Sequence, residues 1–246
     1  MNIFHKVTGL CCGVLCATAV LTAGTITFNT PSNSTVSVGG ETQSVDATAT
    51  FTTSPGTLTV TLENLVSNIH DAGQVLSDLQ FSLSTGGTAS LFSSSGQEVT
   101  VNSGGSKTTG STVSTGWGFG TLSGGLILCD VCPGGVSFQT NPSATPSHTI
   151  IPTASSYPNA NKSIAGNGPH NPFLDGTVSF TIDDSLFTAN TTVDSAIFSF
   201  STASGVDVTG VPNTPGVPEP VSLALTGAGL VGLVGSMRLK RRFSRA

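Results

Sequence analysis

Two cysteines separated by two residues are the first residues whose type and spacing could do chemistry. Cys129 and Cys132 stand in the stretch LILCDVCPGG. Such a pair can form a disulfide, a redox-active dithiol or half of a zinc site. A thioredoxin-type dithiol opens a helix in a βαβ unit, whereas CPGGVSF reads as a turn into a strand. Zinc needs about four ligands, and only the scattered His70, His148 and His170 could join the pair. In an oxidising compartment we therefore expect a structural disulfide and no metal site.

The carboxylates show no arrangement typical of catalysis. Asp183 and Asp184 are adjacent, but neighbours on a strand point to opposite faces, so they form a poor acid–base couple. The sequence has no G-x-S-x-G elbow, no H-E-x-x-H motif and no EF-hand loop. Two carboxylates distant in the chain could still meet in a glycosidase site. We predict no catalytic residue, no cofactor and no enzyme activity, and keep a secreted hydrolase as an alternative.

One aromatic stretch could contact a ligand. In GWGFG, Trp117 and Phe119 alternate with three glycines. Aromatic rings on loops can stack on sugars, but a lone Trp in a β protein is more often buried. His170 and Asp175 could hold a cation with Asn carbonyls, although ordinary turn bonds also explain that loop. Glycan contact by Trp117 and Phe119 is therefore one hypothesis beside core packing.

Alternating apolar and polar residues predict strands that would position these side chains. The segments DATATF and LTVTLENL, joined by TTSPG, predict a hairpin over 46–65 with one Thr-rich, solvated face. The same alternation predicts strands over 177–183 and 195–200. Further short strands are expected at 25–28, 79–84, 97–101, 126–131 and 135–138. Helical periodicity is absent except for a short turn near 71–77.

Many short strands with Gly and Ser turns predict an all-β ectodomain over 24–208. A β-sandwich is the expected architecture, and a jelly roll is one topology that fits. Two long stretches, 102–125 and 141–175, break the alternation and are expected to be loops, functional or disordered. Residues 209–217 are rich in proline and predict a semi-extended spacer.

The charge distribution excludes several partners. Of the eight Lys and Arg residues, five lie in the last nine residues and one is Lys6, whereas only Glu219 of the thirteen acids lies outside 24–217. The ectodomain and spacer therefore carry twelve acids and two bases, a net charge of −10. Nucleic acid requires Lys and Arg against its phosphates, so we expect no nucleic-acid partner.

The N-terminus has the pattern of a secretory signal peptide. Lys6 precedes an apolar stretch, and small residues follow at Ala17, Ala19 and Ala23. Cleavage after Ala23 would leave Gly24 at the start of the first strand, and cleavage after Ala19 is the alternative. We expect residues 1–23 to direct export, which supplies the oxidising compartment that the Cys129–Cys132 disulfide requires.

The C-terminus has the composition of a membrane helix. Residues 221–237 carry no charge and include four glycines, which are common in membrane spans. Seventeen helical residues span about 25 Å, the low end for crossing a bilayer. A basic end at 238–246 follows, and under the positive-inside rule it stays in the cytoplasm. Its bases are Arg238, Lys240, Arg241, Arg242 and Arg245.

Pro218, Glu219 and Pro220 precede this helix, and the three parts together resemble the PEP-CTERM sorting signal of bacterial surface proteins. The resemblance covers about the last thirty residues, 218–246. It implies an exosortase-like enzyme in the inner membrane that recognises the tail and cleaves near the Pro-Glu-Pro motif. It implies nothing about the ectodomain, because very different bodies carry this tail.

These observations lead to one main hypothesis. The chain is expected to be a membrane-anchored precursor that is processed and placed on the cell surface or in the extracellular matrix. There it would have a structural or adhesive role with extracellular polysaccharide. The alternatives are a carbohydrate-binding module and, third, the secreted hydrolase.

Overall fold

The computed structural model describes residues 23–85 and 87–213. The predicted signal peptide, except Ala23, and the predicted sorting tail with its motif, helix and basic end lie outside these residues. Within them, no helix is long and apolar enough to cross a membrane.

The described chain consists of strands, with one 3-10 turn, η1, at Ala72–Gln74. The all-β prediction is therefore confirmed. The strands are β1 Gly24–Asn29, β2 Thr35–Val38, β3 Glu41–Ser44, β4 Ala47–Ser54, β5 Thr57–Asn64, β6 Leu76–Leu83, β7 Ser90–Val101, β8 Lys107–Val113, β9 Gly118–Leu122, β10 Gly125–Cys129, β11 Ser137–Thr140, β12 Ile150–Ile151, β13 Phe173–Asp175, β14 Thr177–Asp183, β15 Val193–Phe200, β16 Asp207–Thr209 and β17 Val211–Asn213.

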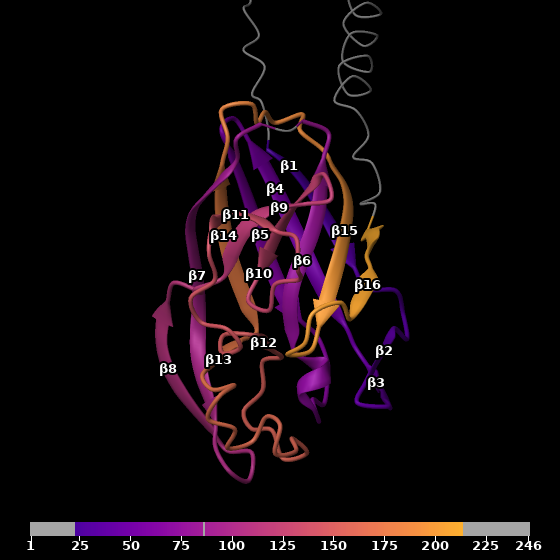
Figure 1. The fold of residues 1–246 in the computed structure, drawn as a ribbon, viewed down its shortest axis with the longest axis vertical. Coiled ribbons are helices and arrows are strands. Elements are labelled where there is room, and N and C mark those ends of the chain that lie inside the picture. Colours follow the sequence, from indigo (N-terminus) through magenta and orange to yellow (C-terminus); the bar gives the residue numbers. More distant parts are fainter. Residues whose placement is uncertain (1–22, 86, 214–246) are drawn as a thin grey trace, which may run out of the picture.

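The strands form two layers in a sandwich-like arrangement (Figure 1). One layer has the order β17-β1-β4-β5-β14-β7, and the other has the order β16-β15-β6-β10-β9-β11. The lower half of β7 turns away from β14 to pair with β8 and β13, and β13 connects through β12 to β6. Hydrogen bonding is therefore continuous from one layer to the other along this side.

The main core lies between the layers. Residues that alternate along β4, β5 and β14 are fully buried, as the period of two predicts. The rings of Phe51 and Phe81, one from each layer, lie 5.3 Å apart between centroids. Trp117 packs against Phe180 at the same separation. Interlocked aromatic rings thus hold the two layers together.

A smaller second core lies at the lower end in Figure 1, where the segment 141–175 folds back under the sheets. Ile151, Tyr157, Ile164 and Phe173 from that segment pack against residues of β7 and the η1 region. The segment was expected to be a long loop. It is mostly without strands, but it carries β12 and β13 and its own buried apolar cluster, which orders it.

The structure departs from the sequence analysis in three places. The stretch 102–125 contains β8 and β9, because a Thr-rich edge strand with exposed side chains shows no apolar alternation. The hairpin β2–β3 was not predicted, since its residues are mostly polar. The predicted spacer at 209–217 is not free at its start: β17 pairs with β1, so the folded body extends beyond residue 208. Pro212 is compatible with this pairing because β17 is an edge strand.

Candidate functional site

The outer side of the first layer is a surface of hydroxyl groups. Every second residue of β1, β4, β5 and β14 points away from the core, and most of these are threonine. We call this surface the hydroxyl face. It consists of Thr25, Thr27, Thr48, Thr50, Thr52, Ser54, Thr57, Thr59, Thr61, Thr177, Ser179, Thr181, Ser90, Ser93 and Ser95.

Strand register arranges these hydroxyls in rows that cross the sheet. One row has five members in direct opposition on five strands: Thr27, Thr50, Thr61, Ser179 and Ser95. The next row is Thr25, Thr52, Thr59, Thr181 and Ser93. Strands lie ~4.8 Å apart, and every second residue along a strand is ~6.7 Å apart. The hydroxyl groups therefore form a two-dimensional grid.

Threonine suits this position for two reasons. Its β-branched side chain favours the strand conformation, and its hydroxyl keeps the outer side solvated. Two cross-strand pairs bond to one another, Thr27 with Thr50 at 3.0 Å and Thr25 with Thr52 at 3.4 Å between hydroxyl oxygens. Within 23–85 and 87–213, the hydroxyls in the middle of the face, on β5 and β14, make no protein hydrogen bond. They are thus available to a ligand.

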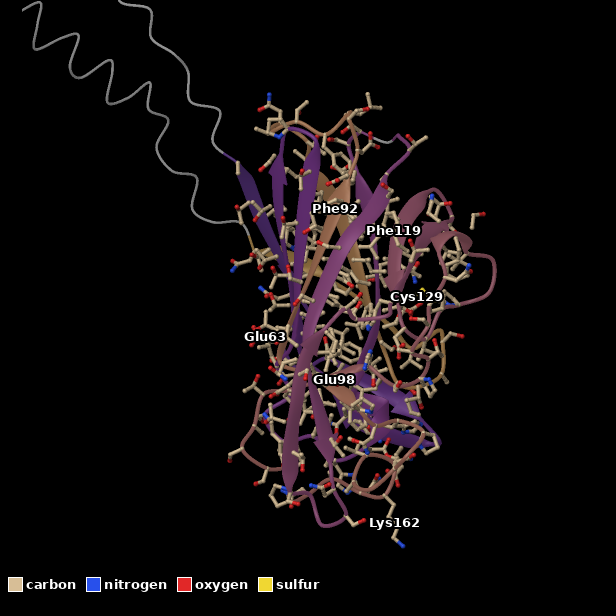
Figure 2. All side chains as sticks on the ribbon, turned by 90° about the vertical axis from the view of Figure 1, so that its left-hand side faces the viewer. Glu63, Phe92, Glu98, Phe119, Cys129 and Lys162 are labelled. Atoms are coloured by element: carbon tan, nitrogen blue, oxygen red, sulfur yellow. A yellow bond between two sulfur atoms is a disulfide. The ribbon has the colours of Figure 1, made fainter. Side chains whose placement is uncertain are left out.

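An exposed aromatic ring lies at the edge of this face. Phe92 is 72% exposed and lies on β7, at the point where the register with β14 shifts by one residue between Thr181 and Ile182. The shift marks a bulge, which re-aims a side chain. Figure 2 shows Phe92 on the strand that crosses the front of the molecule. A large exposed aromatic beside a polar face is an arrangement that can contact sugar rings.

Two pockets open at the lower end of the hydroxyl face, beyond its last row of Asn29, Thr48, Glu63 and Thr177. The Glu63 pocket has a volume of about 200 Å³ and is formed by segments 63–69 and 152–158. The Asp46 pocket has a volume of about 620 Å³ and is formed by segments 29–34, 44–46 and 65–68. The two pockets share segment 65–68, so together they make a trough on either side of it.

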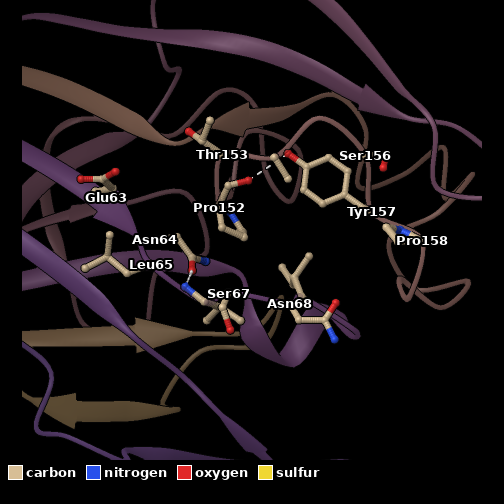
Figure 3. Close-up of a pocket in the computed structure, with 13 residues that line it drawn as sticks. Glu63, Asn64, Leu65, Ser67, Asn68, Pro152, Thr153, Ser156, Tyr157 and Pro158 are labelled. Carbon is tan, nitrogen blue, oxygen red and sulfur yellow. Dashed lines mark hydrogen bonds between the residues drawn. The ribbon is translucent and has the colours of Figure 1, made fainter.

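The walls of the Glu63 pocket are fixed by hydrogen bonds (Figure 3). Asn64 donates to the carbonyls of Gln74 and Ile150, both at 2.9 Å, and accepts from the Val66 N–H. The Tyr157 hydroxyl donates to the Pro152 carbonyl at 2.9 Å. Burial, together with the nearby Asp175 charge, raises the pKa of Tyr157, so the phenol stays neutral. The pocket is thus preformed, and its walls combine the apolar rings of Pro152 and Tyr157 with polar atoms.

Asp71 fixes the chain just beyond segment 63–69, which lines the Glu63 pocket. Its carboxylate accepts from the Gly73 N–H at 2.7 Å, from the Asn161 amide at 2.7 Å and from the Ser163 hydroxyl at 3.2 Å. Burial alone would raise the pKa of Asp71, but these hydrogen bonds and one from Gln43 outweigh it and lower the pKa. The negative charge of Asp71 therefore helps to hold the η1 turn against the 157–171 segment.

The two bases of the body do not reach the hydroxyl face. Lys107 pairs with Asp175 and donates to the Ala154 carbonyl, in a partly buried ion pair under the 141–175 segment. Lys162 is exposed at the lower tip in Figure 2. Glu63 and Asp183 lie in the two end rows of the face, and among the described residues neither forms an ion pair. The face is therefore uncharged in its middle and acidic at its two ends.

The second layer contains two carboxyl groups buried without partners. Asp78 on β6 and Asp130 just after β10 are both fully buried, and all four of their oxygens lack a hydrogen bond within the described structure. Burial raises the pKa of Asp130 to about 8. Burial also raises the pKa of Asp78 to about 7, and the nearby Asp207 charge adds to this. Both groups hold a proton more tightly than an ordinary Asp.

The structure separates the residues that the sequence singled out for glycan contact from the solvent. Trp117 is 1% exposed and Phe119 is fully buried, so neither offers a face for a sugar. The Trp117 indole donates to the His148 carbonyl at 2.8 Å. The hypothesis of glycan contact by Trp117 and Phe119 is therefore wrong. The glycines beside these two rings leave room for the 136–144 segment, whose Pro142 and Phe138 pack closely over Gly118.

The remaining predicted residues have structural places. Cys129 and Cys132 form a disulfide with Cα atoms 5.1 Å apart. Asp183 is half-exposed and Asp184 is buried, on different sides of the strand end. No group of three or more His, Cys, Asp or Glu side chains that could hold a metal exists in the described residues. His170 donates from Nδ1 to the Ser163 carbonyl at 2.6 Å, and Asp175 pairs with Lys107.

The sequence signalled part of this site. The Thr-rich, solvated side of the 46–65 hairpin was predicted, but its extension across five strands and the exposure of Phe92 were not, since both depend on register. Comparisons of the chain with protein-family models, with curated proteins and with solved structures gave no match.

Proposed function

We propose that this chain is an exported surface protein whose β-sandwich body, with a jelly roll as one candidate topology, adheres to extracellular polysaccharide through the hydroxyl face. The observation that carries the proposal is the five-strand grid of hydroxyls, bordered by an exposed phenylalanine and ending in two polar pockets. The acidic body and the resemblance of the tail to a sorting signal support placement outside the cell.

A polysaccharide can match the hydroxyl face group by group. Sugar hydroxyls donate and accept hydrogen bonds, as do Thr and Ser hydroxyls. A chain that runs along the strands meets a new row of hydroxyls every ~6.7 Å. Each hydrogen bond contributes only about 0.5–1.5 kcal/mol net, so useful affinity comes from repetition along the polymer.

The shape of the surface favours a flexible polymer. Neighbouring strands in a sheet are rotated by about 20–25°, so a five-strand face cannot be flat. A single polysaccharide chain can follow such a twisted surface, whereas a rigid crystalline fibre would touch it only locally. We therefore propose a hydrated matrix polysaccharide as the ligand.

The tail is proposed to place the body where it meets this matrix. Pro218, Glu219 and Pro220 would be recognised by an exosortase-like enzyme after the segment 221–237 has entered the inner membrane, with the basic end retained in the cytoplasm. Cleavage near the motif would then release the body to the cell surface. Since β17 ends at Asn213, the motif begins only five residues beyond the folded strand.

Intact mass of the mature protein from its host tests the processing. A C-terminus near residues 217–221 is expected in surface and medium fractions, and Glu219→Ala should leave unprocessed protein in the inner membrane. A mature C-terminus at Ala246 would contradict processing and leave an ordinary membrane-anchored protein.

Catalysis receives no support from the pockets. Among residues 23–85 and 87–213, one acidic residue lines each pocket, Glu63 the first and Asp46 the second. Hydrolysis of a glycosidic bond usually requires two carboxyl groups around the same bond. We therefore propose a binding and structural role, for which a carbohydrate-binding module is the alternative description of the same surface.

Pull-down of the full chain, in mild detergent, with host matrix polysaccharide tests adhesion. The double variant Thr59→Val/Thr61→Val keeps shape and strand preference but removes two central hydroxyls, so we expect roughly tenfold weaker binding. The matched control is Thr109→Val/Thr112→Val on the exposed edge strand β8, which should bind as the unmodified chain does. Equal binding by both double variants would end the hydroxyl-face proposal.

The aromatic contact has its own test. Phe92→Ala should weaken binding, because a stacked sugar loses its apolar partner. Phe138→Ala is the control, since Phe138 is 38% exposed and lies on β11 in the other layer. A loss of the same size in both variants would assign the effect to general surface hydrophobicity and not to Phe92.

A further inference from the structure

We infer that the hydroxyl face and the Glu63 pocket are built for a polysaccharide that carries free amino groups, such as a deacetylated amino-sugar polymer. This inference rests on the proposed function and adds the chemical class of the ligand. Its starting point is the charge of the surface that a polymer chain would cross.

The acidic side chains stand where a polymer running along the face would meet them. Glu63 and Asp183 lie at opposite ends of the face, three rows apart, or about 20 Å along the strands. Asp46 is exposed and lines the adjoining pocket. No Lys, Arg or His belongs to the face among the described residues. A positively charged polymer therefore finds carboxylates at both ends of its track and no repulsion between them.

The Glu63 pocket has the dimensions and the walls for one sugar unit with an amino group. Its volume is about 200 Å³. Leu65, Pro152 and Tyr157 supply apolar surface for the ring, and the oxygens of Ser67 and Asn68 supply acceptors. An ammonium group has only donors, so it suits a pocket with one carboxylate, amide and hydroxyl oxygens and no basic side chain.

The net charge of the body excludes the opposite class. Twelve acids against two bases, with one base already paired to Asp175, repel a polyanionic polysaccharide. A neutral polymer would meet the hydroxyl grid equally well but would leave Glu63, Asp183 and Asp46 without a role. Charge complementarity therefore selects the amino-sugar polymer.

The test compares two forms of one polymer. The full chain in mild detergent is titrated with soluble glucosamine oligomers, fully deacetylated or fully N-acetylated, at about pH 5.5, where the free amino groups are protonated. We expect the deacetylated form to bind at least tenfold more tightly and to lose this advantage at high salt. Equal binding of the two forms would overturn the inference and leave the proposed function standing. Binding of neither form, together with no binding of matrix polysaccharide, would remove the proposed function as well.

Variants separate a local contact from general charge. Glu63→Gln should weaken binding of the deacetylated oligomer by about two- to fivefold, the effect of one partly exposed ion pair, and leave the acetylated form unchanged. Glu41→Gln, an identical substitution on the exposed β3 strand, should change neither. Equal losses in both variants, or polylysine binding as tightly as the amino sugar, would refute recognition by the Glu63 pocket. Calcium-dependent binding of an anionic polysaccharide in preference to the amino sugar would also overturn it.

Discussion

The two buried carboxyl groups predict an unusual dependence of stability on pH. Asp78 and Asp130 have pKa values of about 7 and about 8 in the folded protein, against 3.8 for an ordinary Asp. Between about pH 4 and pH 7 the unfolded chain has released both carboxyl protons, whereas the folded protein retains them. The free energy of unfolding therefore falls as the pH rises from about 4 to about 8, by at most ~1.4 kcal/mol per pH unit for each residue.

The magnitude follows from the shifts. A rise in the pKa of Asp78 from 3.8 to about 7 corresponds to roughly 4 kcal/mol, and the rise for Asp130 corresponds to a similar free energy. The full sum would approach the whole stability of a typical domain, ~5–15 kcal/mol. Relaxation and water entry reduce it, as they do for other buried charges. We therefore expect a loss of about 2–4 kcal/mol between pH 5 and pH 7 from the two residues together.

Asp78→Asn and Asp130→Asn isolate this effect, because asparagine cannot ionise. Each variant should lose part of the pH dependence, so that its stability relative to the unmodified protein improves between pH 5 and pH 7 by about 1–2 kcal/mol. Comparison of two pH values cancels any cost of the buried amide that does not depend on pH. Asp194→Asn is the control, since Asp194 is exposed on β15.

Denaturant unfolding of the full chain in mild detergent, followed by tryptophan fluorescence, measures the effect. Trp117 is the only tryptophan and is buried in the main core, so its emission reports unfolding of the body. Stability that stays constant or rises from pH 5 to pH 7 would refute the reasoning. So would an Asp78→Asn variant with the same pH slope as the Asp194→Asn control.

Three further predictions concern the body. Asp71→Asn should lower the free energy of unfolding by about 1–2 kcal/mol at pH 7, since it weakens charge-assisted hydrogen bonds. Because the pKa of Asp71 is lowered in the folded protein, this contribution should vanish as the pH falls below 3.8 through the folded pKa. Urea titrations at several pH values measure it. Gly118→Ala should destabilise by about 1–3 kcal/mol, because its Cβ would lie 2.8 Å from a proline ring, whereas Gly134→Ala, with open space around it, should leave the melting temperature unchanged. Replacing Cys129 and Cys132 by serine should cost about 2 kcal/mol, the value for a very short loop, and chemical reduction of the unmodified protein should cost the same.

Residues with a clear period of two were placed correctly from the sequence. In the 46–65 hairpin, apolar residues alternate with threonine, and both β4 and β5 follow that pattern. Strands at sheet edges could not be found in the same way. β8 exposes both of its sides, and β17 contains Pro212, so neither has an apolar side to reveal it.

The site was harder to predict because its parts meet only through register. Phe92 reads as an ordinary apolar strand residue until a bulge turns it outward. For Trp117, core packing and glycan contact both fitted the sequence, and the segment that packs over the neighbouring Gly118 is what buries the ring. Asp78 and Asp130 are buried by residues from distant strands, so the sequence around each of them does not predict its burial.

In the proposed function, the same side chains of the hydroxyl face serve folding and binding. A strand whose inner side is apolar needs an outer side that favours the extended conformation and remains in water, and threonine does both. Such a face needs no loop insertion to become a binding surface, because the register that builds the core also builds the grid. Lysine or glutamate in these positions would keep the sheet soluble but would place charge in the middle of the ligand track. Carboxylates at the ends alone, Glu63 and Asp183, leave a neutral hydroxyl track between them and fix where a charged polymer would be held.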